Sequence, residues 1–233
     1  MVNGISILVP TRQRREMFVR MYTSAMSLAN HPANVEVVYY VDDDDSSYDG
    51  LNLYNTTRVS GQRIVLSEMW NATADAARGD IFMHCGDDII FRTEGWDDIV
   101  RAAFNDHEDK ILFVFGDDGS SESNKNDFGT HGFIHRNWVE AVGYFVPPYF
   151  VSDYNDTFLN EMGRKIGRHH SIPILTEHMH YSLGKMEIDQ NTQDRLDRHE
   201  KEHPQDAYNS PWFKKEMEQK REALVKFIES FNK

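Results

Sequence analysis

Short apolar segments alternate with helical segments through the first half of this chain, and this alternation constrains the fold more than any other feature. Five segments have the β-branched, aromatic or apolar character of buried strands: residues 5–9, 35–41, 63–66, 81–84 and 111–115. Three segments between them are typical of helices: residues 18–29, 67–78 and 96–104. Alternating strands and helices predict an α/β fold, with a mostly parallel central sheet flanked by helices.

The second half of the chain has a less regular pattern. Residues 117–132 are rich in Gly, Ser, Asn and Asp and are expected to form a loop. Further strands and helices are predicted at residues 132–135, 137–142, 153–166, within 172–181, and at 211–231. With 233 residues the chain is long enough for one sizeable core and does not require two domains.

Charge and cysteine content narrow the class of protein. The formal net charge of −13 argues against a general nucleic-acid or acidic-membrane binder, despite basic clusters at residues 12–20 and 164–170. Cys85 is the single cysteine, so an internal disulfide and a cysteine-based zinc site are excluded, which suits a reducing cytosol. The first apolar run stops at Pro10 without a basic leader. We therefore expect a cytoplasmic protein without a signal peptide or membrane span.

Polar residues follow several of the predicted strands directly. Pro10, Thr11 and Arg12 come after the first strand, four aspartates at 42–45 after the second, and Asp87 and Asp88 after the fourth. In parallel α/β sheets, ligands bind beyond the carboxyl ends of the strands. We therefore expect the two acidic clusters to converge at one edge of the sheet.

Two of these patterns suit a metal ion. Adjacent carboxylates such as Asp87 and Asp88 are costly unless a cation neutralises them, and Mg²⁺ or Mn²⁺ binds carboxylates together with phosphates. His178 and His180 alternate, so on an extended segment both rings face one side, and Mn²⁺ also accepts imidazole. Each pattern alone is more typical of a solvated turn or a half-exposed strand.

The four aspartates do not form a calcium loop of the EF-hand type. A loop starting at Asp45 would need a glutamate at its twelfth position, and that position is Thr56. The sequence also lacks glycine-rich phosphate loops and a GxSxG nucleophile turn. Asp153 and Asp156 open a predicted helix, where they could cap the helix or act as a general base.

Four segments, taken in order, resemble the GT-A-fold glycosyltransferases, and are similar to family 2. They are ISILVPTRQR, VVYYVDDDDSSYD, NATADAARGDIFMHCGDDIIF and, more loosely, SDYNDTFLNEMGRKIG. The match departs from the family pattern at Asp44 and Asp45, in the order Gly-Asp-Asp of the metal motif, and at Asn155, where the family often has Glu. The chain would be one domain, with a nucleotide-sugar-binding half at 1–116, an acceptor-side half at 117–185 and a C-terminal helical extension at 186–233.

The resemblance implies a nucleoside-diphosphate sugar donor, most often a UDP-sugar in this family. It implies this set of donor-binding residues: Pro10, Thr11, Arg12, Asp42, Asp43, Asn71, Arg78 and Asp87. Asp43 would bind the base, and Asp88 would hold Mn²⁺ or Mg²⁺ with His178 or His180, of which His178 is slightly favoured. Asp156 would deprotonate the acceptor hydroxyl and give inversion, with Asp153 as the competing candidate.

The acceptor is the least constrained part of this interpretation. Some phage enzymes with this resemblance glycosylate hydroxymethylated pyrimidines in DNA, in the host cytoplasm, and such a pyrimidine is the acceptor that the resemblance suggests. The net charge of −13 argues against a DNA acceptor, whereas the two basic clusters argue modestly for it. Two other classes of function stay open. One is a nucleotidyltransferase on a related α/β scaffold, which would release pyrophosphate. The other is an inactive module that binds sugar nucleotides or metal.

Overall fold

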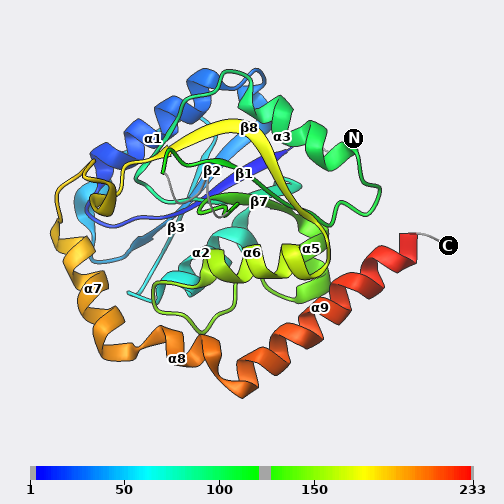
Figure 1. Cartoon of the computed structure of the whole chain (residues 1–233). Coiled ribbons are helices and arrows are strands. Elements are labelled where there is room, and N and C mark those ends of the chain that lie inside the picture. Colours follow the sequence, from blue (N-terminus) through cyan, green and yellow to red (C-terminus); the bar gives the residue numbers. More distant parts are fainter. Residues whose placement is uncertain (1–3, 121–126, 232–233) are drawn as a thin grey trace.

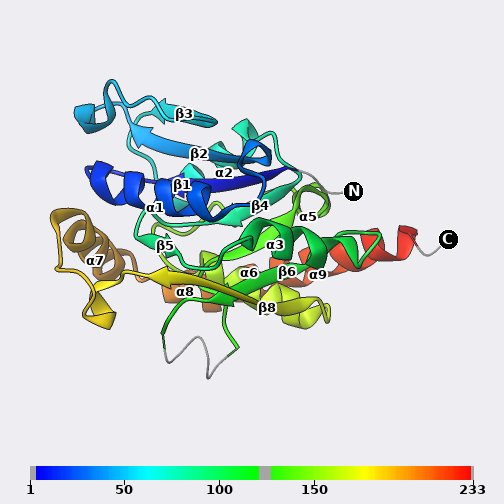
Figure 2. The same cartoon turned by 90° about the horizontal axis from the view of Figure 1, so that it is seen from above.

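The computed structural model describes residues 4–120 and 127–231, which form an eight-stranded sheet with helices on both faces (Figures 1 and 2). The strand order is β3-β2-β1-β4-β7-β6-β8-β5. The strands are β1 Ile5–Pro10, β2 Val35–Asp42, β3 Thr56–Gly61, β4 Ile81–His84, β5 Ile89–Phe91, β6 Phe113–Asp117, β7 Gly132–His135 and β8 His169–His178. The α/β class predicted from the sequence is confirmed.

The described residues also form eight α-helices and three 3₁₀ turns, of which η3, α7, α8 and α9 follow the last strand. The helices are α1 Arg15–Leu28, α2 Leu66–Ala76, α3 Trp96–Asn105, α5 Arg136–Val142, α6 Asn155–Lys165, α7 Gln190–Glu202, α8 Pro204–Asn209 and α9 Pro211–Phe231. The 3₁₀ turns are η1 Pro32–Asn34, η2 Ser46–Tyr48 and η3 Tyr181–Leu183. The C-terminal helices α7, α8 and α9 run in an arc along one side of the molecule (Figure 1).

The first four strands of the sheet order are parallel. β1 lies between β2 and β4, with Ile5 aligned to Val35 and to Ile81, and β2 pairs with β3 on its other side. Their carboxyl ends therefore lie at one edge, which places the segments after β1, β2 and β4 next to one another.

The other half of the sheet is mixed. β7 is antiparallel to β4 and β6, whereas β8 is parallel to β6 and antiparallel to β5. The sheet as a whole is thus mixed, and the expected parallel arrangement holds for its first half. The β5–β8 pairing brings the carboxyl end of β8 next to the turn between β4 and β5.

Alternating side chains of the strands supply two cores. Ile5, Ile7 and Val9 face α1 and α3, where they pack with the buried Phe18 and Trp96. The opposite face packs against α2, α5, α6 and α9 through a second set of buried side chains, including Leu8, Phe82, Trp70, Trp138, Phe158 and Phe213. Burial on both faces makes the central strands apolar along most of their length.

Three details differ from the sequence-based expectation. The strand predicted at residues 63–66 is wrong: the third strand is Thr56–Gly61, where β-branched residues alternate, and residue 66 already begins α2. The helix predicted at residues 67–78 spans Leu66–Ala76, so Ser67 lies inside it, where its hydroxyl donates to the carbonyl of Phe150. The short β5 and the polar helices α7 and α8 were not predicted, since β5 has three residues and α7 has almost no apolar stripe.

Within residues 4–120 and 127–231, every helix is too short or too polar to cross a lipid bilayer.

Candidate active site

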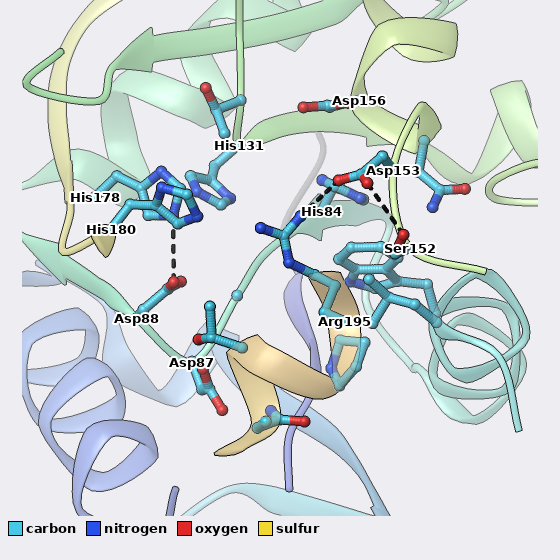
Figure 3. A pocket seen from close by; sticks show the side chains of 18 of the residues that line it. His84, Asp87, Asp88, His131, Ser152, Asp153, Asp156, His178, His180 and Arg195 are labelled. Carbon is cyan, nitrogen blue, oxygen red and sulfur yellow. Dashed lines mark hydrogen bonds and ion pairs between the residues drawn. The ribbon is translucent and has the colours of Figure 1, made fainter. Parts of the chain in front are cut away.

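A cavity of about 220 Å³ lies beyond the carboxyl ends of β1 and β4 (Figure 3). Its walls come from the β4–β5 turn, the segment before β7, the start of α6, the end of β8 and α7. The titratable side chains that line it are Arg14, His84, Asp87, Asp88, His131, Asp153, Asp156, His178, His180, Arg195 and Arg198. The cavity lies at the edge of the sheet where the strand-end argument predicts a ligand site.

Asp87 is held by donors from the segment after β1. Thr11 Oγ1 donates to Asp87 Oδ2 over 2.6 Å, and Arg14 Nη1 donates to Oδ1 over 3.3 Å. The Tyr48 hydroxyl lies 2.5 Å from the same Thr11 oxygen. Burial, reinforced by the charge of Asp88, raises the pKa of Asp87 despite the opposing charge of Arg14. Asp87 therefore fixes the shape of the turn that presents Asp88.

Asp88 and His178 are brought together by the pairing of β5 with β8. Ile89 aligns with His178, and the backbone N–H of Met179 donates to the Asp88 carbonyl over 2.8 Å. The two side chains then lie 3.3 Å apart, measured from Asp88 Oδ2 to His178 Nε2 (Figure 3). Burial acts against the charge on Asp88, but contact with His178 outweighs it and keeps the pKa of Asp88 below its usual range.

This pair fits one side of an open metal site. Two ligands about 2.1–2.2 Å from one ion, at roughly a right angle, are about 3.0–3.1 Å apart, and the Asp88–His178 separation of 3.3 Å is close to this spacing. Among the residues that the structure describes, no three His, Cys, Asp or Glu side chains converge to hold a metal ion by themselves. Asp88 and His178 could thus serve as two ligands from the described part of the chain, with phosphate oxygens or water completing the coordination.

Two further histidines stand beside His178. His180 Nδ1 is 2.7 Å from Ser182 Oγ, and its ring centroid lies 4.8 Å from that of His178. His131, which the sequence did not single out, is buried against His178 with a ring separation of 4.8 Å. Neither ring nitrogen of His131 has a hydrogen-bond partner within the described part of the chain. Burial lowers the pKa of both His131 and His180, the latter to about 4, so both rings are neutral at pH 7.

Asp153 and Asp156 differ sharply in their surroundings. Asp153 accepts from Arg195 Nη1 over 2.7 Å and also contacts His199 Nδ1, so its charge is compensated. Asp156 lies in the first turn of α6 and lines the cavity. Among the described residues its carboxylate accepts only from Thr157, whose N–H is 2.7 Å from Oδ1. Burial raises the pKa of Asp156 to about 6. Of the two candidates, Asp156 has the properties of a general base.

A smaller cavity of about 60 Å³ adjoins the first one and shares Pro10, Leu66, Asn191 and Arg198 with it. Thr11, Arg12 and Asp42 also line this smaller cavity. Arg12 Nη1 donates to Asp42 Oδ2 over 2.7 Å, and the same guanidinium contacts both carboxylate oxygens of Asp44. Asp42 Oδ1 is buried and has no partner among the described residues.

The run of four aspartates therefore divides differently from the expectation. Asp43, the expected base-binding residue, is exposed and lines neither cavity, whereas Asp42 is fully buried. Asp44 is exposed and paired with Arg12. Asp45 is buried, and it accepts from the backbone N–H groups of Gln13 and Ser47.

Besides Asp43, two more expected donor-binding residues lie outside both cavities, Asn71 and Arg78. Asn71 is bonded to the segment before α6: its Nδ2 donates to Val146 O, and its Oδ1 accepts from the N–H groups of Phe145 and Val146. Arg78 is paired with Glu36 near the amino end of β2, at the opposite edge of the sheet. Their positions along the sequence match the family pattern, but only the tertiary structure shows where they face.

Helix α7 contributes residues that sequence reasoning missed. Asn191, Thr192, Arg195 and Arg198 all line the main cavity. Arg14 ties the start of the helix to the body of the protein through a two-pronged contact with Asp189 at 2.6 and 2.7 Å. The segment reads as a solvated polar helix, so no local pattern indicates that it covers a site.

No known protein family matches the sequence, and no curated protein matches it. Solved structures do resemble the chain. A mannosyltransferase, PcManGT from Pyrobaculum calidifontis in complex with GDP-Man and Mn²⁺, shares 12% identity at a TM-score of 0.60, covering 99% of this chain and 74% of that one. Residues 1–349 of TarS from S. aureus share 12% identity at a TM-score of 0.55, covering 97% and 81%. The chain therefore has a GT-A-like fold.

Proposed function

We propose that this chain is a metal-dependent glycosyltransferase that moves a sugar from a nucleoside-diphosphate sugar to an acceptor hydroxyl. The observation that carries the proposal is the convergence of Asp88, His178 and Asp156 on one cavity at the carboxyl edge of a GT-A-like sheet. The complex of the mannosyltransferase with GDP-Man and Mn²⁺ supports the same class of donor and metal.

Asp88 and His178 are the proposed metal ligands. A bound Mn²⁺ or Mg²⁺ would neutralise the charge that develops on the leaving diphosphate. Because the described protein residues supply only two converging ligands, the site depends on the diphosphate to complete it. Metal affinity is therefore expected to be higher when the nucleotide is bound than when it is absent.

Asp42 is the proposed base contact, in place of the exposed Asp43. Its Oδ2 is held by Arg12 while its buried Oδ1 is left without a partner at the small cavity. A buried carboxylate oxygen gains most from an N–H donor such as the imide of uracil, since the bond is charge-assisted. This supports UDP as the nucleotide of the donor.

Asp156 is the proposed general base, and Asn155 stands beside it. The Asn155 side chain is 1% exposed, and both its amide oxygen and its amide nitrogen lack partners in the described structure. Such an amide can pair with neighbouring hydroxyls of a sugar, which donate and accept. Deprotonation of the acceptor hydroxyl by Asp156 leads to direct displacement at the anomeric carbon, with inversion.

The acceptor is proposed to be a small hydroxyl compound. A hydroxymethylated pyrimidine in DNA also offers a hydroxyl, but a duplex needs free basic surface. Arg12, Arg14 and Arg168, from the two basic clusters, are paired with carboxylates. These ion pairs leave less positive charge for DNA than the sequence suggests.

A product-release assay tests the proposed function. UDP- and GDP-sugars are incubated with Mn²⁺ and a panel of hydroxyl acceptors, including hydroxymethylated DNA and its unmodified counterpart. We expect release of UDP that stops on addition of EDTA. Release of pyrophosphate would identify a nucleotidyltransferase instead, and donor binding without release for any acceptor would identify a binding module.

A further inference from the structure

Arg198 occupies a distinctive place between the two cavities. It lies on α7, and its side chain lines both the 220 Å³ cavity that holds Asp88 and the 60 Å³ cavity that holds Asp42. A ligand that spans the two cavities must therefore pass this guanidinium. In the arrangement proposed above, the base contact and the metal pair lie on opposite sides of it.

The other arginines around the cavities are already neutralised. Each of them contacts a carboxylate at 2.5 to 3.0 Å: Arg12, Arg14, Arg63 and Arg195. Arg198 has no ion pair or hydrogen bond to any residue that the structure describes, and its Nε is buried. The buried Nε–H has lost water without gaining a protein acceptor, and such an unpaired donor costs free energy.

The surroundings of Arg198 add to this cost. Burial and the nearby charge of Arg63 both act against its positive charge and lower its pKa, and Asp194 and Asp42 only partly offset them. Asp194 is itself committed to Arg63, and Asp42 to Arg12. The pocket therefore holds a cation whose carboxylate neighbours are bound to other arginines.

Resting on the proposed function, we infer that Arg198 binds the diphosphate of the donor. The diphosphate is the part of a nucleoside-diphosphate sugar that lies between base and sugar, as Arg198 lies between the two cavities. A guanidinium matches phosphate oxygens in geometry and charge. Helix α7 is then a wall of the donor site, and the charge of Arg198 is compensated only when donor or product is bound.

Calorimetric titration of the full chain tests this role. UDP and uridine, and GDP and guanosine, are titrated into the wild type and into Arg198→Met, once with Mn²⁺ and once with EDTA. Loss of charge-assisted bonds should weaken binding of the preferred diphosphate roughly 10- to 100-fold in both conditions. Binding of the matching nucleoside should change less than threefold. Arg198→Lys keeps the positive charge but lacks the planar guanidinium, so its affinity for the diphosphate should lie between those of the wild type and Arg198→Met.

Thermal unfolding of the free proteins distinguishes binding from a structural role. Arg198→Met should be as stable as the wild type or more stable, since a half-buried charge whose Nε has no partner among the described residues is removed. Arg221→Met is the control, because this partly exposed arginine of α9 contacts only Glu218 among the described residues. This variant should bind UDP normally.

The outcomes separate the two proposals. If the wild type binds a diphosphate and Arg198→Met binds it equally well, the role of Arg198 is wrong and the proposed function stands. Lower stability of free Arg198→Met with unchanged affinity would assign it a structural role. If the wild type binds neither UDP nor GDP, the proposed function fails and this inference with it.

Discussion

At the scale of single residues, three carboxylates around one cavity have three different environments. Asp88 is kept ionised by His178, Asp153 is compensated by Arg195 and His199, and Asp156 is buried with only local donors. Because the environment sets the pKa of a carboxylate, side chains of one type can take different roles within one site. The predictions at this scale concern Asp156.

Activity should rise with pH as Asp156 loses its proton. A base acts in its deprotonated form, so with a pKa of about 6 the turnover should increase up to pH 6–7 and then level off. Asp156→Asn should lower turnover by roughly 10²- to 10⁴-fold while donor affinity is retained. Steady-state kinetics from pH 5 to 8 measure both effects. Unchanged turnover in the variant would refute the assignment.

The same substitution should stabilise the protein. Burial raises the folded-state pKa of Asp156 from an ordinary 3.8 to about 6, so the wild type loses stability as pH rises through this window. Asp156→Asn lacks the charge and should be more stable by roughly 1–3 kcal/mol at pH 8, with the gain vanishing near pH 4.

Asp153→Asn is the matched control for this stability effect. It removes ion pairs with Arg195 and His199, both partly exposed, and should lower stability at pH 7 by about 1 kcal/mol or less. Urea unfolding of both variants measures the difference. A loss of stability in both would show that burial of Asp156 carries no electrostatic cost.

At the scale of elements, the two long C-terminal helices are held in different ways. α7 buries only Thr192 and is tied to the body by ion pairs of Arg14 with Asp189, Arg63 with Asp194 and Arg195 with Asp153. α9 instead inserts apolar side chains into the core: Phe213, Met217 and Leu224. Salt screens exposed ion pairs but not apolar contacts.

Helix α7 should therefore open more readily as ionic strength increases. Amide hydrogen exchange of residues 190–202 is expected to accelerate several-fold between about 0.05 and 1 M NaCl, where the Debye length falls from more than 10 Å to about 3 Å. Exchange in residues 211–231 should change little and serves as the internal control. Equal salt responses in both helices would contradict this prediction.

Asn71 is expected to stabilise the segment that leads into α6. Its side chain makes four hydrogen bonds, to the backbone of Ser67, Phe145 and Val146. Asn71→Ala should cost roughly 2–4 kcal/mol by urea unfolding. Asn137→Ala removes one side-chain bond, to Asp109, and should cost about 1 kcal/mol. A near-neutral Asn71→Ala would show that these contacts are replaceable.

At the scale of the whole molecule, donor and metal should stabilise the fold together. Ligand at 100 times its dissociation constant adds about 2.7 kcal/mol to the free energy of unfolding. A thermal-shift panel of nucleotides with and without Mn²⁺ should show the largest shift for one diphosphate plus metal, and a smaller shift for either alone. Additive shifts would contradict a metal site that the diphosphate completes.

The sequence by itself determined the α/β class, most of the strands, and the strand-end positions of the polar residues. Hydrophobic periodicity and local turn chemistry carry this information, because a strand buried on both faces must be apolar wherever it lies in the sheet. Asp87, Asp88, His178, Asp153 and Asp156, proposed from the sequence, all line one cavity.

Only the tertiary structure decided which polar residues meet. The β5–β8 pairing sets His178 against Asp88, and burial separates Asp42 from Asp43. Pairing with Arg195 and His199 separates Asp153 from Asp156, and folding of α7 across the strand ends brings Arg198 between the cavities. The physical reason is that burial and charge compensation depend on partners remote in the chain. Local spacing carries no record of these partners, as the positions of Asn71 and Arg78 also show.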